Sequence, residues 1–267
     1  PRMSNSLQEH NHDRGPSTAP VQPRPKRWHH ALLAQTRAEL RMTLRNPEQL
    51  LVSVFIPLGI LVFFSTVPVF ETETRHAIDS VAPSVLALAV MSSALVSLGI
   101  GTGFERYYGV LKRLGTTPLG RPRWILAKLL TVVAIEFLQW LLIIPAALAL
   151  GWNPAWGWGT AILAALLATL AFGGIGLLLA GTLPGMLNLA VCNALYLVLM
   201  LIGGVIIRLS VMPAPLAAFA RVLPTAPLTE IMQGAFRPAD ISLTSWLVLG
   251  TWALLAPVAA AVTFRWE

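Results

Sequence analysis

The chain has 267 residues, of which 55% are apolar and only 12% are charged, and its formal net charge is +7 at pH 7. Its mean hydropathy is +0.68. This balance excludes an ordinary soluble domain, which would expose more charge, and indicates a polytopic membrane protein. The basic excess alone could suggest nucleic-acid binding. No basic patch lies in a soluble region large enough to read a nucleic acid, so we expect no such partner.

The chain begins with residues 1–27, which are polar and rich in proline and are expected to form a disordered cytoplasmic tail. Residues 28–47 are expected to form an interfacial helix. Its arginines recur at i, i+4 and i+8 beside an apolar stripe, at Arg37, Arg41 and Arg45. Asn46-Pro47 then ends the helix and redirects the chain. We therefore predict an elbow helix that lies in the membrane interface and leads into the first span.

Residues 48–267 are expected to form an all-α transmembrane domain with six spans. A helix needs roughly 20 apolar residues to cross about 30 Å of hydrocarbon. Windows of that length cover about residues 50–70, 81–103, 129–150, 158–181, 187–207 and 246–264. Eight Lys and Arg residues precede the first span, six lie between the second and third spans and Arg265 follows the last, whereas only four fall in the segments on the other side. Because cytoplasmic loops carry such an excess, we expect both termini in the cytoplasm.

Residues 104–114, between the second and third spans, are expected to form a short amphipathic helix. On a helical wheel its apolar face carries Phe104, Tyr107, Tyr108, Leu111 and Leu114, and its charged face carries Glu105, Arg106, Lys112 and Arg113. Such a helix can lie along the headgroups and present its charges to a soluble partner. An ordinary basic loop would explain the charge but not the aromatic face.

Polar side chains inside the spans are candidates for the substrate path. A charged group at that depth is rare, and Glu136 is therefore a functional candidate, with Gln139 one turn away as a hydrogen-bond partner. Glu136 could bind a cationic drug, form a protonated hydrogen bond between helices, or lie near the cytoplasmic water layer. The fifth span adds Asn188, Asn193 and Tyr196, and amides in membranes commonly bond between helices.

Several kinds of chemistry have no motif in this sequence. There is no P-loop, no cluster with metal-ligand spacing and no nucleophile or zinc-protease signature. We therefore expect no catalytic residue, no metal and no cofactor in this chain. A membrane-embedded enzyme would need such a constellation. A self-standing secondary transporter, with Glu136 as the coupling acid, would be expected to show more ionisable residues and inverted repeats in its spans.

Four stretches together resemble the type-2 ABC transporter permeases. They are Leu44-Arg-Asn-Pro-Glu-Gln-Leu-Leu51, Phe104-Glu-Arg-Tyr-Tyr-Gly-Val-Leu-Lys-Arg-Leu-Gly-Thr-Thr-Pro-Leu119, Ala127-Lys-Leu-Leu130 and Leu223-Pro-Thr-Ala-Pro-Leu-Thr-Glu-Ile-Met-Gln-Gly-Ala-Phe236. The resemblance covers roughly residues 31–267. Within the family the pattern is closest to the bacterial drug and antibiotic exporter branch.

This resemblance implies a half-permease of a bacterial inner membrane that pairs with a second copy or a paralogue. Two cytoplasmic subunits would bind ATP and Mg, and membrane lipids would surround the pair. Residues 104–114 would be the coupling helix, with the ATPase-coupling residues Glu105, Arg106, Tyr108, Gly109, Lys112, Arg113 and Leu114. The cargo would be hydrophobic or amphiphilic drugs, antibiotics or lipids, moved outward. Export of lipid-linked cell-surface polysaccharide is the alternative within the same architecture.

The exterior segment of residues 208–245 is rich in proline and too apolar for a flexible linker. The resemblance implies short helices that dip into the outer leaflet and cap an exit path, with Arg221 and Glu230 available to pair. The residues themselves leave a packed re-entrant segment and a surface cap both open.

Overall fold

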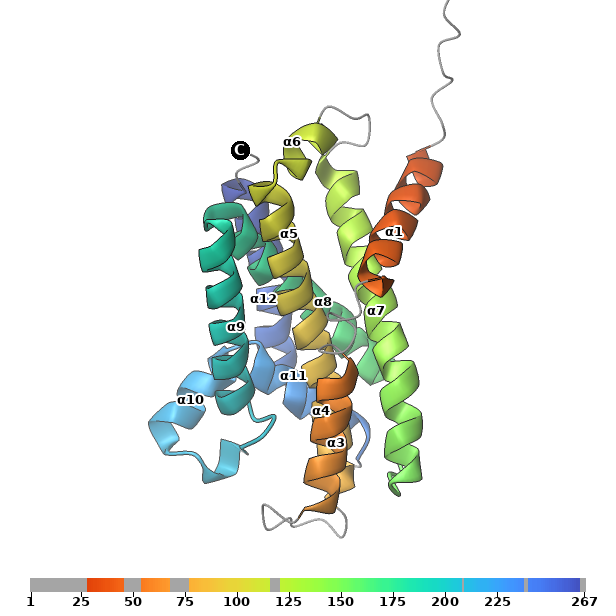
Figure 1. Cartoon of the computed structure of the whole chain (residues 1–267). Coiled ribbons are helices and arrows are strands. Elements are labelled where there is room, and N and C mark those ends of the chain that lie inside the picture. The colour runs from red at the N-terminus through yellow and green to blue at the C-terminus, as the bar shows by residue number, and fades with distance from the viewer. Residues whose placement is uncertain are drawn as a thin grey trace, which may run out of the picture.

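A computed structural model describes residues 28–45, 54–67, 77–115, 121–207, 209–237 and 240–264. Every regular element in these ranges is a helix. The helices form one elongated bundle, with α6 and the end of α12 at one end and α10 and α11 toward the other (Figure 1). The predicted tail of residues 1–27 lies outside the described residues.

The helices have the following bounds in chain order. They are α1 (Trp28–Leu44), α3 (Ile56–Thr66), α4 (Ile78–Met91), the π-helical η2 (Ser92–Ser97), α5 (Leu98–Tyr107), α6 (Val110–Gly115), α7 (Arg121–Ala149), α8 (Trp158–Thr182), α9 (Gly185–Ile202), the 3-10 turn η3 (Leu209–Val211), α10 (Ala214–Val222), α11 (Thr225–Ala235) and α12 (Leu243–Thr263).

Five of these helical stretches are long and apolar enough to cross a membrane. They are Ile78–Tyr107, Pro122–Ala149, Trp158–Thr182, Gly185–Ile202 and Leu243–Thr263. The polytopic all-α architecture is thereby confirmed. The first expected span, residues 50–70, is described only over 54–67, where α3 is a shorter apolar helix of 11 residues. The count of six spans therefore stays a prediction.

The centre of the bundle is the continuous helix formed by α4, η2 and α5. It packs against α7, α8 and α9, and its lower half also against α3 and α11. Every side chain from residue 82 to residue 95 is buried. A helix that is apolar on all sides is compatible with a core or with lipid, and here the packing of the neighbouring helices around it decides the central position.

Small residues allow the long helices to approach closely. A Cβ atom at Gly174 of α8 would lie 2.4 Å from the backbone nitrogen of Pro257 in α12. A Cβ atom at Gly99 of α5 would lie 3.0 Å from the Cα atom of Gly176 in α8. Glycine at these contacts brings the backbones together, as is common between membrane helices.

Several helix boundaries differ from the sequence prediction. The second span, expected at 81–103, runs from Ile78 to Tyr107, and the fifth, expected at 187–207, is α9 and ends at Ile202. The third span, expected at 129–150, belongs to α7, which begins at Arg121 because Pro122 is tolerated in a first turn and the polar residues before 129 continue the helix. The sixth span, expected at 246–264, begins at Leu243 because the Ser242 hydroxyl caps α12, accepting from the Thr244 backbone N–H at 3.2 Å.

The expected exterior loop, 208–245, is largely helical, containing η3, α10 and α11. Prolines in the first turns of α10 and α11 are compatible with helix formation there. α11 packs against α4, α8 and α12 and buries Leu228, Ile231 and Met232. α10 lies at the surface and exposes Phe219 and Val222. The packed and the surface-lying arrangement thus both occur, one in each helix.

Candidate functional site

The corner between α5 and α6 is formed where the chain reverses its direction at the end of the bundle (Figure 1). The sequence predicted one helix over residues 104–114. Instead, α5 continues to Tyr107, and α6 starts at Val110. Gly109 separates them with φ +72°, a left-handed conformation that glycine adopts without steric cost. The amphipathic segment is therefore a bent pair of helical pieces.

Three charged side chains from three helices meet directly below this corner. The ammonium group of Lys128 in α7 donates to Glu39 in α1, with Nζ 2.7 Å from Oε2. It also donates to Glu105 Oε1 in α5. The side chains of Lys128 and Glu39 are only 7% and 8% exposed, and that of Glu105 is 21% exposed. We call this cluster the Lys128 triad.

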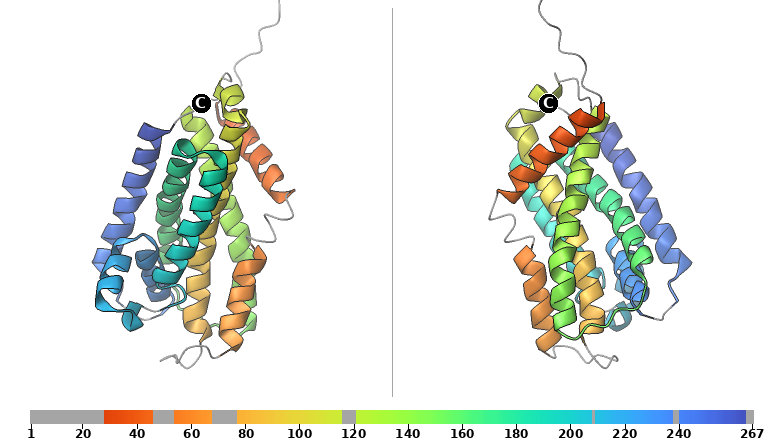
Figure 2. Two further views of the ribbon diagram at one scale, coloured as in Figure 1. Left: turned by 60° about the vertical axis from the view of Figure 1, so that its left-hand side comes forward. Right: turned by 90° about the vertical axis from the view of Figure 1, so that its right-hand side faces the viewer.

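Neighbouring groups hold the Lys128 triad in place. Gln35, one turn before Glu39 on α1, donates to Glu39 Oε1 at 2.8 Å. Lys128 Nζ lies 5.6 Å from the ring centroid of Trp124, a distance typical of a cation–π contact. Helix α1 crosses α7 obliquely at this level, which brings Glu39 over Lys128 (Figure 2, right).

Because it is buried, the Lys128 triad holds α1, α5 and α7 together. A buried ammonium ion needs hydrogen-bond acceptors in place of its water, and here two carboxylates supply them, so separating the partners would leave an uncompensated charge. The triad consequently ties α1, α5 and α7 together at the end where α6 lies. A displacement of α5 at this end is thereby passed to two further helices.

Arg106 lies beside the triad but points toward a different helix. Its Nη1 donates to the backbone oxygens of Ala180 at 3.0 Å and Leu183 at 3.2 Å. These carbonyls belong to the C-terminal end of α8, where a cation is favoured by the free carbonyls and the helix dipole. Arg106 therefore holds α5 against α8 within the chain.

The remaining predicted coupling residues differ in exposure. Tyr108 is 70% exposed, Lys112 is exposed and Leu111 between them is fully buried. The side chains of Arg113 and Leu114 lie outside the described residues. A cavity of about 330 Å³ opens between this corner and the turn from α8 to α9, and its lining includes Gly103, Arg106, Lys112 and Pro184. Exposed aromatic and basic groups next to a cavity suit contact with another protein.

The two substrate-path candidates on α7 are engaged with different helices. The Thr169 hydroxyl of α8 donates to the Glu136 carboxyl group, with Thr169 Oγ1 2.8 Å from Glu136 Oε2. Thr169 Oγ1 also lies 2.8 Å from the Ala165 backbone oxygen. Gln139 is buried and its Oε1 accepts from the Ser93 hydroxyl of η2 at 2.9 Å. Both side chains thus bridge helices of the same chain.

The candidates on α9 lie elsewhere. Asn188 is buried, and its Nδ2 donates to the Gly99 backbone oxygen of α5 at 2.9 Å. Asn193 is exposed and donates to the Leu189 backbone oxygen of its own helix at 3.0 Å, while Tyr196 is partly buried. Because α7 packs on α4 and η2 whereas α9 packs mainly on α5, the five candidates do not form one site within the chain.

Sequence reasoning missed Glu39 and Lys128 as interacting groups. Both residues were visible as charges close to expected membrane segments, and Gln35 with Glu39 shows the i, i+4 spacing of a helix pair. Their pairing, however, spans 89 residues of sequence. Among the described residues, no group of three or more His, Cys, Asp or Glu side chains lies close enough to hold a metal ion.

Comparisons with known proteins agree with the all-helical membrane architecture. Residues 30–237 match the family described as ABC-2 type transporter. The chain is also similar to the protein named "Putative transport permease YvfS" of Bacillus subtilis (strain 168), with 26% identity over 208 residues. That alignment covers 73% of this chain and 80% of the relative. The family match over residues 30–237 includes nearly all of α1, the α5–α6 corner and the Lys128 triad.

Proposed function

Because the chain belongs to the ABC-2 type transporter family, we propose that it is the permease of an exporter and that the α5–α6 corner receives its ATPase subunits. Membership makes the chain a transport permease that resides in a membrane and associates with ATPase subunits. The alternatives of a membrane-embedded enzyme and of a self-standing secondary transporter are thereby set aside. Direction, cargo and stoichiometry belong to the proposal.

The observation that carries the proposed coupling is the Lys128 triad. It joins the helix that enters the corner to both α1 and α7. Closure of two ATPase subunits would push on α6 and the exposed Tyr108 and Lys112. Since α5 is fixed to α1 and α7 by buried charges, and to α8 by Arg106, the push would tilt these helices together.

Residues at this corner divide into two roles in the proposal. Tyr108, Lys112 and Arg113 would touch the ATPase subunit, with Gly109 setting their angle and Leu114 completing the apolar face. Glu105 and Arg106 would transmit the movement, because their described partners lie inside the chain. Two permease copies, or one copy and a paralogue, would each present such a corner in a bacterial inner membrane with both termini cytoplasmic.

The proposed cargo is a hydrophobic or amphiphilic drug, antibiotic or lipid that moves outward between the two permeases. Large apolar side chains are exposed along α9 and α12, among them Leu197, Leu201, Leu254 and Val258. Such surfaces suit contact with lipid, a second permease or an apolar cargo. Asn193 is the exposed polar group on α9 and would be available to a cargo, whereas Glu136, Gln139 and Asn188 would shape the path by fixing its helices.

The test is the ATPase activity of the complex co-purified in lipid. We expect hydrophobic drugs or lipids to stimulate the native complex. The double variant Tyr108→Ala with Lys112→Ala should lower that stimulation by about tenfold, the effect of losing an interface hot spot. Trp156→Ala, an exposed aromatic residue beyond α7, is the matched control and should keep native stimulation. Native stimulation in the double variant would refute docking at this corner.

A further inference from the structure

A second cavity, separate from the α5–α6 corner, lies between α10, α11 and the start of α12. Its volume is about 590 Å³, and charged and hydroxyl groups line most of it. In the bundle these three elements lie toward the end opposite α6 (Figure 1). The cavity is therefore remote from the proposed ATPase contact.

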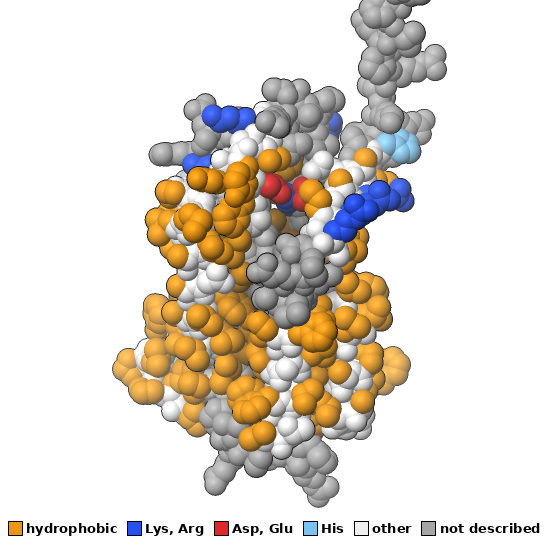
Figure 3. Space-filling view, in the orientation of Figure 1, with side chains coloured by type: hydrophobic (Ala, Val, Ile, Leu, Met, Phe, Trp, Pro, Cys, Tyr) orange, Lys and Arg blue, Asp and Glu red, His pale blue; other side chains and the backbone are white. Residues whose placement is uncertain are grey.

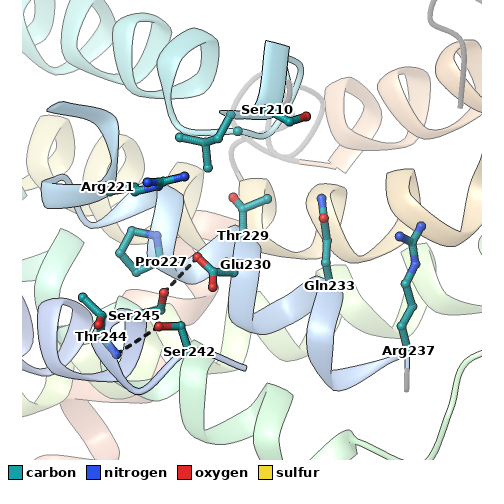
Figure 4. Close-up of a pocket in the computed structure, with 12 residues that line it drawn as sticks. Ser210, Arg221, Pro227, Thr229, Glu230, Gln233, Arg237, Ser242, Thr244 and Ser245 are labelled. Carbon is teal, nitrogen blue, oxygen red and sulfur yellow. Dashed lines mark hydrogen bonds between the residues drawn. The ribbon is translucent and has the colours of Figure 1, made fainter. Parts of the chain in front are cut away.

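The charged groups of this cavity come from different elements. Arg221 lies in the last turn of α10, Glu230 lies in α11, and Arg237 follows α11. In Figure 4 the Arg221 guanidinium and the Glu230 carboxylate lie near each other, and Gln233 and Arg237 extend the row along α11. The placement of the Arg221 guanidinium beside the Glu230 carboxylate suits a ligand that carries charges of both signs.

Hydrogen bonds hold the helices that line the cavity to one another and to α4. The Ser245 hydroxyl of α12 donates to Glu230 Oε2 at 2.9 Å, and Gln233 Nε2 of α11 donates to the Ser84 hydroxyl of α4 at 2.8 Å. The Trp252 indole N–H donates to the Val222 backbone oxygen at 2.8 Å, which holds the end of α10 to α12. The Glu230 carboxylate can accept more hydrogen bonds than the one from Ser245.

The helices that line the polar cavity also expose apolar side chains. Phe219 and Val222 are exposed on α10, which carries Arg221, and Leu243 and Leu247 are exposed at the start of α12, which carries Ser245. A ligand with a polar head and hydrocarbon chains would satisfy both surfaces. A small soluble zwitterion would leave the apolar surface uncovered.

We propose that this cavity binds the headgroup of a zwitterionic phospholipid with a primary amine, of the phosphatidylethanolamine type. Its phosphate lies at Arg221, because a guanidinium group donates two parallel hydrogen bonds to phosphate oxygens. Its ammonium group lies at Glu230, where it donates to the carboxylate oxygens. Its acyl chains lie along the apolar side chains of α10 and α12. This binding needs no ATPase subunit and so goes beyond the proposed transport function.

The experiment is native mass spectrometry of the purified full chain in detergent, titrated with lipids of identical acyl chains. Phosphatidylethanolamine should bind about tenfold more tightly than phosphatidylglycerol, which lacks the amine, and than phosphatidylcholine, whose amine has no N–H donor. Equal affinity for all three lipids would overturn the proposal. Displacement by free phosphoethanolamine as efficient as by the lipid would overturn the lipid assignment in favour of a soluble ligand.

Variants locate the site. Glu230→Gln should lower the affinity for phosphatidylethanolamine about tenfold and leave the affinity for phosphatidylglycerol unchanged. Arg221→Gln should weaken both lipids, and Asp240→Asn, an exposed acid outside the cavity, should weaken neither. Ser245→Ala removes the hydrogen bond that orients the Glu230 side chain and should weaken phosphatidylethanolamine more than phosphatidylglycerol. This variant is the second test should Glu230→Gln fail to purify. An unchanged preference for phosphatidylethanolamine over phosphatidylglycerol in Glu230→Gln, or unchanged affinity for both lipids in Arg221→Gln, would contradict the site.

Discussion

Lys128 is buried between two carboxylates that belong to different helices, and this arrangement has a definite energetic consequence. A buried ion pair contributes little net stability compared with apolar residues of similar volume, because desolvation offsets the attraction. Loss of one partner is costly because the other charge remains without water. Removing one charge of the Lys128 triad should therefore lower the free energy of unfolding more than replacing all three charged groups together.

We expect Lys128→Met to lower the free energy of unfolding by about 3 kcal/mol, because Glu39 and Glu105 would remain buried without their cation. Thermal unfolding of the purified chain, followed by tryptophan fluorescence, measures this loss. Lys112→Met changes an exposed lysine and should have little effect. The triple variant with Glu39→Gln and Glu105→Gln should regain most of the lost stability. Native stability of Lys128→Met alone would contradict this account of the triad.

Glu136 should tolerate replacement by glutamine. The Gln amide can donate to Thr169 Oγ1 while the hydroxyl donates to the Ala165 oxygen, so the bond between α7 and α8 persists. We expect Glu136→Gln to change the free energy of unfolding by less than about 1 kcal/mol and to keep drug-stimulated ATPase activity. Loss of stimulation by cationic drugs alone, with unchanged unfolding, would show that Glu136 binds the drug as an anion.

The partners that individual charged side chains contact could not be predicted from the sequence. Arg106 could be identified as a cation near the membrane surface, but its contact with the end of α8 depends on how α5 and α8 cross. Glu39 could be read as part of a solvated helix face until the crossing of α1 over α7 placed it on Lys128. Local periodicity determines which face a residue occupies, whereas tertiary packing determines what that face touches.

At the scale of elements, the apolar windows predicted the long helices because hydrophobic length is what a membrane selects. The windows placed the starts of α7 and α12 too late. Polar first turns with a proline or a serine cap extend these helices beyond their apolar parts. For the segment 208–245 the resemblance implied short helices, and the residues left a packed and a surface-lying arrangement both open. Helix α11 is buried and α10 lies at the surface, a difference that tertiary packing decides and the proline pattern does not show.

The contact between α8 and α12 provides a test at this scale. Gly174→Ala would place a Cβ atom 2.4 Å from the Pro257 nitrogen and 2.6 Å from the Ala256 carbonyl carbon, so the backbones must separate. We expect a loss of about 2 kcal/mol in the free energy of unfolding, as for other overpacked cores. Gly159→Ala lies in the same helix with no atom within 4 Å of the new Cβ. This control should stabilise the chain slightly, and equal melting of the two variants would contradict the packing.

At the scale of the whole molecule, charge is distributed unevenly along the bundle. Lys and Arg side chains are visible around the end that carries α1 and α6, and hydrophobic side chains cover much of the remaining face (Figure 3). Under the positive-inside rule this end would face the cytoplasm. The proposed ATPase contact, the Lys128 triad and the basic residues would then lie on the side where ATP is available, with the lipid cavity on the opposite side.

The most direct measurement of this arrangement is cross-linking between the permease and its co-purified ATPase subunit. A cysteine is introduced at Lys112 in a Cys192→Ala background, and a thiol-to-amine reagent is added to membranes. The control cysteine replaces Val211, which is exposed in η3 away from the α5–α6 corner. The account predicts a cross-link to the ATPase subunit from position 112 and none from position 211. A cross-link from position 211 and none from 112 would contradict both the coupling site and the orientation.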